Sequence, residues 1–149
     1  METAAEYGDT FAQVCRHETT RAFFASACAK DVEMCSVDIQ HAFLTSPIDR
    51  VVYMETPEGF ERDGYCIRLG ASIYGLCSAP RAYHQDFDKY LKQLQLHPEQ
   101  ADTCMYTSSN PDYPDLQLIE YVDDLILQGC KQSIEKFKVD LQKKYKIRD

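Results

Sequence analysis

The stretch Tyr121-Val122-Asp123-Asp124 lies between two apolar, β-prone runs, residues 116–120 before it and residues 125–127 after it. Two such runs around a pair of adjacent aspartates predict a β-hairpin with the acids at its tip. One interpretation is that Asp123 and Asp124 only make the turn, because an aspartate side chain can hydrogen-bond its own backbone. The other is that a rigid hairpin presents carboxylates to a divalent cation, which prefers oxygen ligands. This stretch alone leaves both interpretations open.

A further carboxylate stands near the end of another predicted strand. Residues 34–39 alternate in character and predict a strand with Asp38 close to its C-terminal end. Carboxylates that gather without a metal repel one another, and at least one tends to keep its proton. Two divalent cations about 3.5–4 Å apart remove that conflict. A lone aspartate at a strand end is also a common surface residue or helix cap, so this interpretation of Asp38 stays open as well.

The bulk composition is that of an ordinary globular domain. The chain has 149 residues, enough for one domain with its own core, and 44% of them are hydrophobic. No run of about 18 apolar residues exists, which excludes a membrane-spanning helix, and the acidic first residues argue against a secretory signal. The seven cysteines are scattered without a C-x-x-C pair. They indicate free thiols in a reducing compartment rather than a zinc site or a disulfide framework.

The charge balance bears on the choice of partner. The formal net charge is −8, whereas a domain that holds nucleic acid normally carries a basic stripe for the phosphates. Either nucleic acid is not the partner, or the basic surface lies in other parts of a longer chain. The one locally basic zone, residues 131–148, is expected to form the solvated face of a helix.

The remaining elements are predicted from the spacing of apolar residues. Helices are expected over residues 17–30, 80–95 and 132–145, and further strands over residues 51–54, 65–69 and 104–107. The residues expected to face the core are Phe24, Ala27 and Cys28 in the first helix, Tyr83, Phe87, Tyr90, Leu91 and Leu94 in the second, and Ile134, Phe137, Leu141 and Tyr145 in the third. We therefore expect an α+β domain, a mainly antiparallel sheet with the helices packed on one face. In such a sheet the end of the Asp38 strand can lie beside the hairpin tip.

Six segments of the sequence, taken in order, resemble the reverse transcriptase domain of copia-type (Pseudoviridae) LTR retrotransposon polyproteins. They are YGDTFA at residues 7–12, VDIQHAFL at 37–44, VYMETPEGF at 52–60, IYGLCSAPR at 73–81, DTCMY at 102–106 and YVDD at 121–124. A YVDD motif alone is weak, whereas six motifs in the family's order cover nearly the whole chain.

The resemblance implies a fold and a metal site. The fold would be the palm of a right-handed polymerase with part of the fingers, as a single partial domain over residues 1–149. Asp38 and Asp123 would be the principal metal ligands, and Asp124 the third catalytic carboxylate. The backbone carbonyl of Ile39 would add a metal contact. The implied cofactor is a pair of Mg²⁺ or Mn²⁺ ions.

The resemblance also implies a nucleotide-binding surface. Phe43 matches the bulky aromatic residue under the sugar of the incoming nucleotide, where a flat ring excludes a 2′-hydroxyl. Tyr74 and Gly75 match the loop that packs near the nucleotide and the template. Tyr121 and Val122 would support the hairpin turn. On the sequence pattern alone, Phe43 is a core aromatic and Tyr74 an ordinary turn aromatic.

The implied partners are an RNA or DNA template with its primer, deoxynucleoside triphosphates and the remainder of the polyprotein, in a cytoplasmic virus-like particle and without a membrane. The sequence departs from the family where many relatives read Lys-Gln-Ala-Pro, because Cys77-Ser78-Ala79-Pro80 lacks the cation, and where Gln13 replaces a proline. We expect the basic fingers segment, the thumb and the RNase H region to lie outside these residues.

Three functions follow from this sequence. The first is an RNA-directed DNA polymerase that uses two-metal nucleotidyl transfer. The second is a catalytically inactive retrotransposon-derived fragment or interaction module. The third is metal-dependent hydrolysis by the same carboxylates, for which His41 is the nearest general-base candidate.

Overall fold

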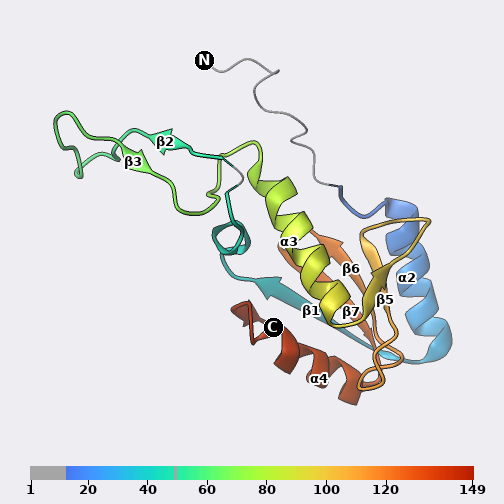
Figure 1. Cartoon of the computed structure of the whole chain (residues 1–149). Coiled ribbons are helices and arrows are strands. Elements are labelled where there is room, and N and C mark those ends of the chain that lie inside the picture. Colours follow the sequence, from blue (N-terminus) through green and yellow to red (C-terminus); the bar gives the residue numbers. More distant parts are fainter. Residues whose placement is uncertain (1–12, 49) are drawn as a thin grey trace.

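The computed structural model describes residues 13–48 and 50–149, so the first of the six motif segments, residues 7–12, lies outside the described residues. Its centre is a six-stranded sheet in the order β4-β5-β6-β7-β1-β8, in which every neighbouring pair is antiparallel (Figure 1). The strands are β1 (Glu33–Ile39), β4 (Leu96–Pro98), β5 (Met105–Ser108), β6 (Gln117–Tyr121), β7 (Asp124–Gly129) and β8 (Ile147–Arg148). The mainly antiparallel sheet is therefore confirmed.

Two helices bury the main core on one face of this sheet, α3 (Ala79–Gln93) and α4 (Lys131–Leu141). Pro80 stands in the first turn of α3, where its missing N–H costs nothing. The residues predicted to face inward are confirmed: Tyr83, Phe87, Leu91, Ile134, Phe137, Leu141 and Tyr145 are buried, and Tyr90 and Leu94 pack partly buried against them. The 3.6-residue spacing therefore identified both buried faces.

The remaining helix, α2 (His17–Lys30), lies on the opposite face of the sheet, so the expectation that all helices pack on one face was wrong. Leu118 and Ile119 are consecutive in β6 and point to opposite faces. Leu118 belongs to the main core, whereas Ile119 packs in a separate cluster with Phe23 of α2. The buried face of α2 also differs from the prediction, since Phe23 is buried and Phe24 is 40% exposed.

The buried face of α2 was predicted wrongly because of the sequence of the helix itself. Ala27 is buried as predicted, but Cys28 is exposed. Apolar residues are spread around this helix, so its pattern does not single out one face. Packing against the sheet makes the choice instead.

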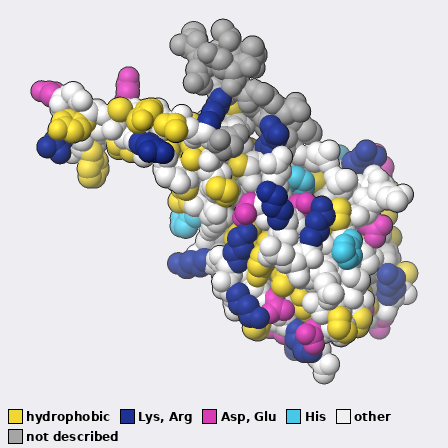
Figure 2. All heavy atoms as spheres, viewed as in Figure 1, with side chains coloured by type: hydrophobic (Ala, Val, Ile, Leu, Met, Phe, Trp, Pro, Cys, Tyr) yellow, Lys and Arg dark blue, Asp and Glu magenta, His cyan; other side chains and the backbone are white. Residues whose placement is uncertain are grey.

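A separate two-stranded unit projects from the body of the molecule (Figure 1). We call residues 50–69 the arm; in it β2 (Tyr53–Met54) pairs antiparallel with β3 (Ile67–Arg68). Both strands were predicted, but they are shorter than expected and stay apart from the main sheet. Large apolar side chains gather on the arm surface (Figure 2), and the exposed ones are Val51, Tyr53, Phe60, Tyr65 and Ile67.

Two strands of the main sheet were not predicted. Residues 96–98 follow α3 as edge strand β4, directly after the helix that was expected over residues 80–95. At the other edge β8 pairs with β1, with Ile147 opposite Ile39. Both strands are three residues or shorter, so no alternation was available to detect them. Within the described part of the chain, no helix has the length and apolar character needed to span a membrane.

Candidate functional site

The YVDD stretch forms the predicted hairpin tip. Tyr121 is the register partner of Asp124, so Val122 and Asp123 make a two-residue loop between β6 and β7. Val122 has a φ of +60°, and a positive φ at the first loop residue is the pattern of a type II′ turn. Glycine normally holds that position. A β-branched residue there carries strain of about 1–3 kcal/mol, and such strain concentrates at functional sites.

The tertiary structure places Asp38 directly beside this tip. Strand β1 is hydrogen-bonded to β7, and Asp38 is the register partner of Asp124. The Ile39 N–H donates to the backbone oxygen of Asp123 at 2.8 Å, which fixes the end of β1 to the turn. Register partners share one face of a sheet, with Cβ atoms about 4.5–5.5 Å apart. The prediction that these two segments meet is confirmed.

The three aspartates act on one another electrostatically. Partial burial raises the pKa of Asp124, and the negative charges of Asp123 and Asp38 raise it further. Among residues 13–48 and 50–149, however, no group of three or more His, Cys, Asp or Glu side chains converges closely enough to hold a metal ion. The fold thus places the carboxylates at one end of the sheet, but they are not close enough together to form a metal-binding group.

Beside the Asp38–Asp124 pair lies a hollow of about 380 Å³, lined by Ser36, Asp38, Asp124, Arg148 and Asp149. Arg148 of β8 is the register partner of Asp38 on the side away from β7. Sequence reasoning did not find Arg148. The only available signal was its place in the basic end of the chain, which was interpreted as part of a solvated helix face.

The predicted nucleotide-binding residues lie next to the tip. Phe43 is 8% exposed and packs in the main core, and its ring centroid is 4.6 Å from that of Tyr74, which is 54% exposed. Partial burial raises the pKa of Tyr74, as do the charge of Asp123, a hydrogen bond to Asp123 and the charge of Asp38. Tyr74 therefore lies beside Asp123, and its ring packs against that of Phe43.

Two further residues near the site have left-handed backbone. Gly75 has a φ of +99°, a conformation that glycine reaches without steric cost, and it follows Tyr74 in the chain. His41 has a φ of +57° and stands exposed before the short 3₁₀ helix η1 (Ala42–Thr45), which carries Phe43.

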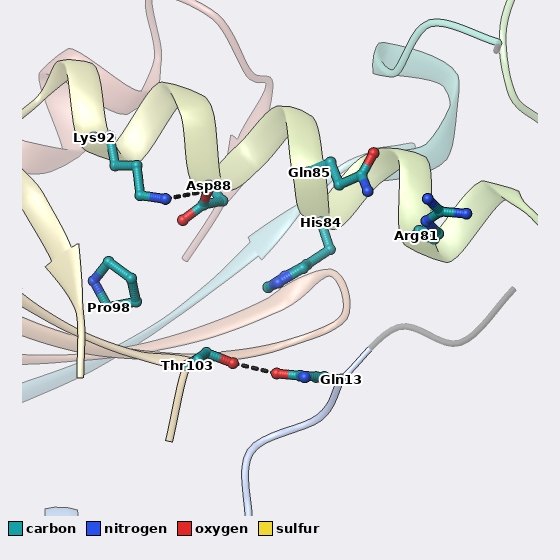
Figure 3. Close-up of a pocket in the computed structure, with 8 residues that line it drawn as sticks. All are labelled: Gln13, Arg81, His84, Gln85, Asp88, Lys92, Pro98 and Thr103. Atoms are coloured by element: carbon teal, nitrogen blue, oxygen red, sulfur yellow. Dashed lines mark hydrogen bonds and ion pairs between the residues drawn. The ribbon is translucent and has the colours of Figure 1, made fainter. Parts of the chain in front are cut away.

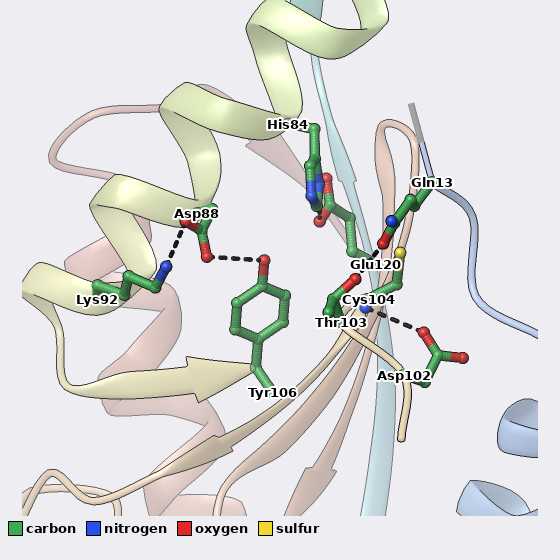
Figure 4. Close-up of polar contacts among 9 residues, drawn as sticks. All are labelled: Gln13, His84, Asp88, Lys92, Asp102, Thr103, Cys104, Tyr106 and Glu120. Carbon is green, nitrogen blue, oxygen red and sulfur yellow. Dashed lines mark hydrogen bonds and ion pairs between the residues drawn. The ribbon is translucent and has the colours of Figure 1, made fainter. Parts of the chain in front are cut away.

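A buried acid–base pair behind the tip was also missed. Glu120 of β6 lies 2.9 Å from Nδ1 of His84 on α3, and the side chain of Glu120 is only 3% exposed (Figure 4). Burial raises the pKa of Glu120, and His84 partly offsets that rise. The hydrogen bond to Glu120 raises the pKa of His84, against the effect of burial. The available signal was a glutamate in an apolar run directly before the YVDD stretch.

Known proteins with similar sequences carry the same kind of domain. The sequence model of the family described as reverse transcriptase (RNA-dependent DNA polymerase) matches residues 2–149. The chain is 32% identical, over 97% of its length, to a retrovirus-related Pol polyprotein from transposon TNT 1-94 of Nicotiana tabacum. It is 27% identical over the same share to the Pol polyprotein from transposon RE2 of Arabidopsis thaliana.

A putative transposon Ty5-1 protein of Saccharomyces cerevisiae is 31% identical over 76% of the chain. The chain spans 11% and 10% of the lengths of the tobacco and Arabidopsis polyproteins and 38% of the yeast protein. The chain therefore belongs to the reverse transcriptase family, in the group carried by copia-type retrotransposon Pol polyproteins.

Proposed function

We propose that this chain is the palm, with part of the fingers, of an RNA-directed DNA polymerase that adds deoxynucleotides to a primer 3′-hydroxyl by two-metal transfer. The observation that carries the proposal is the register pairing of Asp38 with Asp124, beside Asp123 on a strained two-residue turn. Three carboxylates, two from paired strands and one from the turn, then occupy one end of the sheet. The family assignment supports the same chemistry.

The donor set suits hard divalent cations. Asp38 and Asp123 would be the principal ligands, with Asp124 and the backbone carbonyl of Ile39 as further oxygen donors. The raised pKa of Asp124 supports this assignment, because it reflects negative charge that a cation at this end of the sheet would offset. When bound, two Mg²⁺ or Mn²⁺ ions would activate the 3′-hydroxyl and stabilise the leaving pyrophosphate.

The neighbouring aromatic residues would hold the nucleotide. Phe43 is buried against Tyr74 and Tyr83, so its ring cannot move aside for an added hydroxyl group. It would exclude a 2′-hydroxyl and select deoxynucleotides. Tyr74 and Gly75 would line the nucleotide and template side of the tip, and Tyr121 with Val122 would keep the turn in place.

The same proposal names the partners and the setting. Residues 1–149 would form one partial domain that works with the remainder of its polyprotein on a primed RNA or DNA template and deoxynucleoside triphosphates. The net charge of −8 makes basic surface from the rest of the polyprotein necessary for tight binding of nucleic acid. A cytoplasmic virus-like particle would be the place of action.

A second candidate is a catalytically inactive fragment or interaction module. Two observations favour it: the carboxylates do not converge into a metal-binding group within the described residues, and the arm exposes several large apolar side chains. Exposed apolar clusters of this kind mark surfaces that other proteins cover.

Primer extension on an RNA template with Mg²⁺ or Mn²⁺ tests the first candidate. Asp123→Asn should lower the rate at least about a hundredfold, because the transition state loses several kcal/mol of charge stabilisation. The matched control is Asp112→Asn, since the Asp112 side chain is 68% exposed in a surface ion pair with Lys136. Equal extension by the wild type and Asp123→Asn would refute two-metal catalysis at this site. No extension by any form would favour the second candidate.

A further inference from the structure

We propose that His84 and Glu120 are a positioning pair that holds the acidic tip in place, and that they do so only while the two side chains share one proton. The proposal rests on the proposed function in one respect, since it takes the tip to be the site of polymerisation. Neither residue is among those assigned to metal or nucleotide binding above.

The pair lies directly behind the tip. Glu120 is the last residue before Tyr121, and its N–H donates to the backbone oxygen of Cys104 at 2.8 Å. Its side chain points to the same face as Leu118, toward α3, where it meets Nδ1 of His84 at 2.9 Å. Both the backbone and the side chain of Glu120 are therefore held, and any movement of this residue is passed to the turn.

The pair also joins the two halves of the site. Helix α3 begins at Ala79, shortly after Tyr74 and Gly75, so His84 belongs to the element that carries the predicted nucleotide loop. Glu120 belongs to the strand that carries the turn. Tyr74 in turn contacts Asp123. The His84–Glu120 bond therefore closes a ring of contacts that fixes α3 relative to the tip.

Among the described residues, His84 is the positively charged partner that lowers the pKa of Glu120. The titratable groups that face Glu120 are otherwise hydroxyl and thiol groups or acids: Tyr83 and Asp88 of α3, Cys104 before β5, Tyr106 of β5 and Tyr145 after α4. Glu120, Asp88 and Lys92 act on His84, and Arg81 lines the same cavity as His84. Lys92 is engaged with Asp88 at 2.7 Å (Figure 4).

Proton sharing decides the net charge behind the tip. With one proton the pair is neutral overall, whether the proton lies on the imidazole or on the carboxylate. Burial raises the pKa of Glu120 and its hydrogen bond raises the pKa of His84, so both shifts favour keeping that proton. Both also give the same sign: the stabilisation is present while the pair keeps its one proton and is lost as the pH rises through the pKa at which the folded pair releases it. Above it, a buried negative charge stands behind three aspartates.

The proton can exchange with solvent. The side chain of His84 is 21% exposed and lines a cavity of about 460 Å³ between α3 and the segment that holds Thr103 (Figure 3). Glu120 itself is shielded by the protein. The ring of His84 is therefore the route by which solution pH reaches the back of the hairpin.

The first test follows the tip by NMR in the full chain without metal. In the wild type, the amide resonances of Tyr121 and Val122 should titrate with the same midpoint as the His84 ring. In Glu120→Gln that response should vanish, because the amide oxygen still accepts the Nδ1–H bond but carries no charge. His97→Gln is the matched control, since His97 also hydrogen-bonds through its ring, to Ser109, but is exposed on edge strand β4. The proposal is overturned if the Tyr121 and Val122 amide resonances do not shift as His84 titrates.

The second test compares primer extension across the same pH range. The rate of the wild type relative to Glu120→Gln should fall about tenfold or more through the His84 titration, since small misplacements of reacting groups cost up to about a hundredfold. His97→Gln should follow the wild type. Equal profiles for the wild type and Glu120→Gln overturn the positioning pair and leave the polymerase standing. If no form extends a primer while the tip amides follow His84, the polymerase proposal fails and the positioning pair stands.

Discussion

The sheet and the arm derive from equally recognisable motifs, yet they are built in opposite ways. The sheet end that carries the tip is held by paired strands on both sides of β7 and by buried residues of α3 and α4. The arm has two strands of two residues each, and Phe60 at its end is 78% exposed. A motif in the sequence therefore does not imply a packed element in the fold.

The two regions also differ in the source of their stability. The sheet buries its apolar side chains within the chain itself, which stabilises it by roughly 25 cal/mol per Å² of apolar surface. The arm leaves its apolar side chains outside every core cluster formed by the described residues. An isolated two-stranded ribbon is at best marginally stable in water.

Amide hydrogen exchange gives the largest expected contrast. Amides in the interior of β1 and β7 should exchange only through global unfolding, whereas those of the arm, such as the Leu69 N–H bonded to Val52, should exchange through local opening. We expect the two free energies of opening to differ by about 5 kcal/mol or more. Equal protection in both regions would show that the arm is as cooperative as the sheet.

Removal of one aromatic ring from each region should separate them next. Phe87 is fully buried, with its ring centroid 5.7 Å from those of Tyr83 and Tyr145. Phe87→Ala should lower the free energy of unfolding by about 3–5 kcal/mol in urea denaturation. Phe60→Ala in the arm should change it by less than about 0.5 kcal/mol. A similar loss in both variants would contradict the contrast.

Asp102 gives a smaller, pH-dependent effect. Its carboxylate accepts hydrogen bonds from the N–H groups of Arg16 at 2.9 Å and Cys104 at 3.0 Å, tying the start of α2 to β5. Burial raises the pKa of Asp102, but these bonds and one from Thr19 outweigh burial and hold the pKa below its ordinary value. Asp102→Asn should cost about 1.5–3 kcal/mol at neutral pH.

The sign of that pH dependence follows from the lowered pKa. The stabilisation from Asp102 is complete above its unfolded pKa and is lost as the pH falls through its folded pKa. Urea denaturation between pH 7 and pH 2.5 should show the wild type approaching Asp102→Asn on the acid side. Asp63→Asn, at an exposed site in the arm, is the control and should leave the curve unchanged. A constant gap at all pH values would rule out the ionised carboxylate as the cause.

The smallest expected effect concerns the strained turn. Val122→Gly should raise the free energy of unfolding by about 1 kcal/mol. It relieves the strain at φ +60°, but glycine loses more conformational entropy on folding, which cancels part of that stabilisation. Gly59→Ala places a side chain at φ +85° in the arm and should change global stability by less than about 0.5 kcal/mol. A destabilised Val122→Gly would mean that Val122 contributes more by packing than it loses by strain.

Much of the local structure was predictable from the spacing of residues. The buried faces of α3 and α4 and the hairpin around Asp123 follow from periods of 3.6 and 2 residues within single elements. The same method failed for α2, where Phe23 rather than Phe24 is buried, and for β4 and β8, which are too short to show a period. Spacing within an element says nothing about the face of the sheet on which that element packs.

The motifs and the hydrophobic pattern were enough to predict the family and the acidic hairpin. The folded structure was needed to show that Asp38 stands opposite Asp124, that Tyr74 lies beside Asp123, and that His84 and Glu120 share a buried hydrogen bond. The reason is how far apart along the chain the interacting residues lie. Periodicity reflects forces between residues a few positions apart, whereas strand register and buried pairs are set by packing between segments that meet only once the chain has closed its long loops.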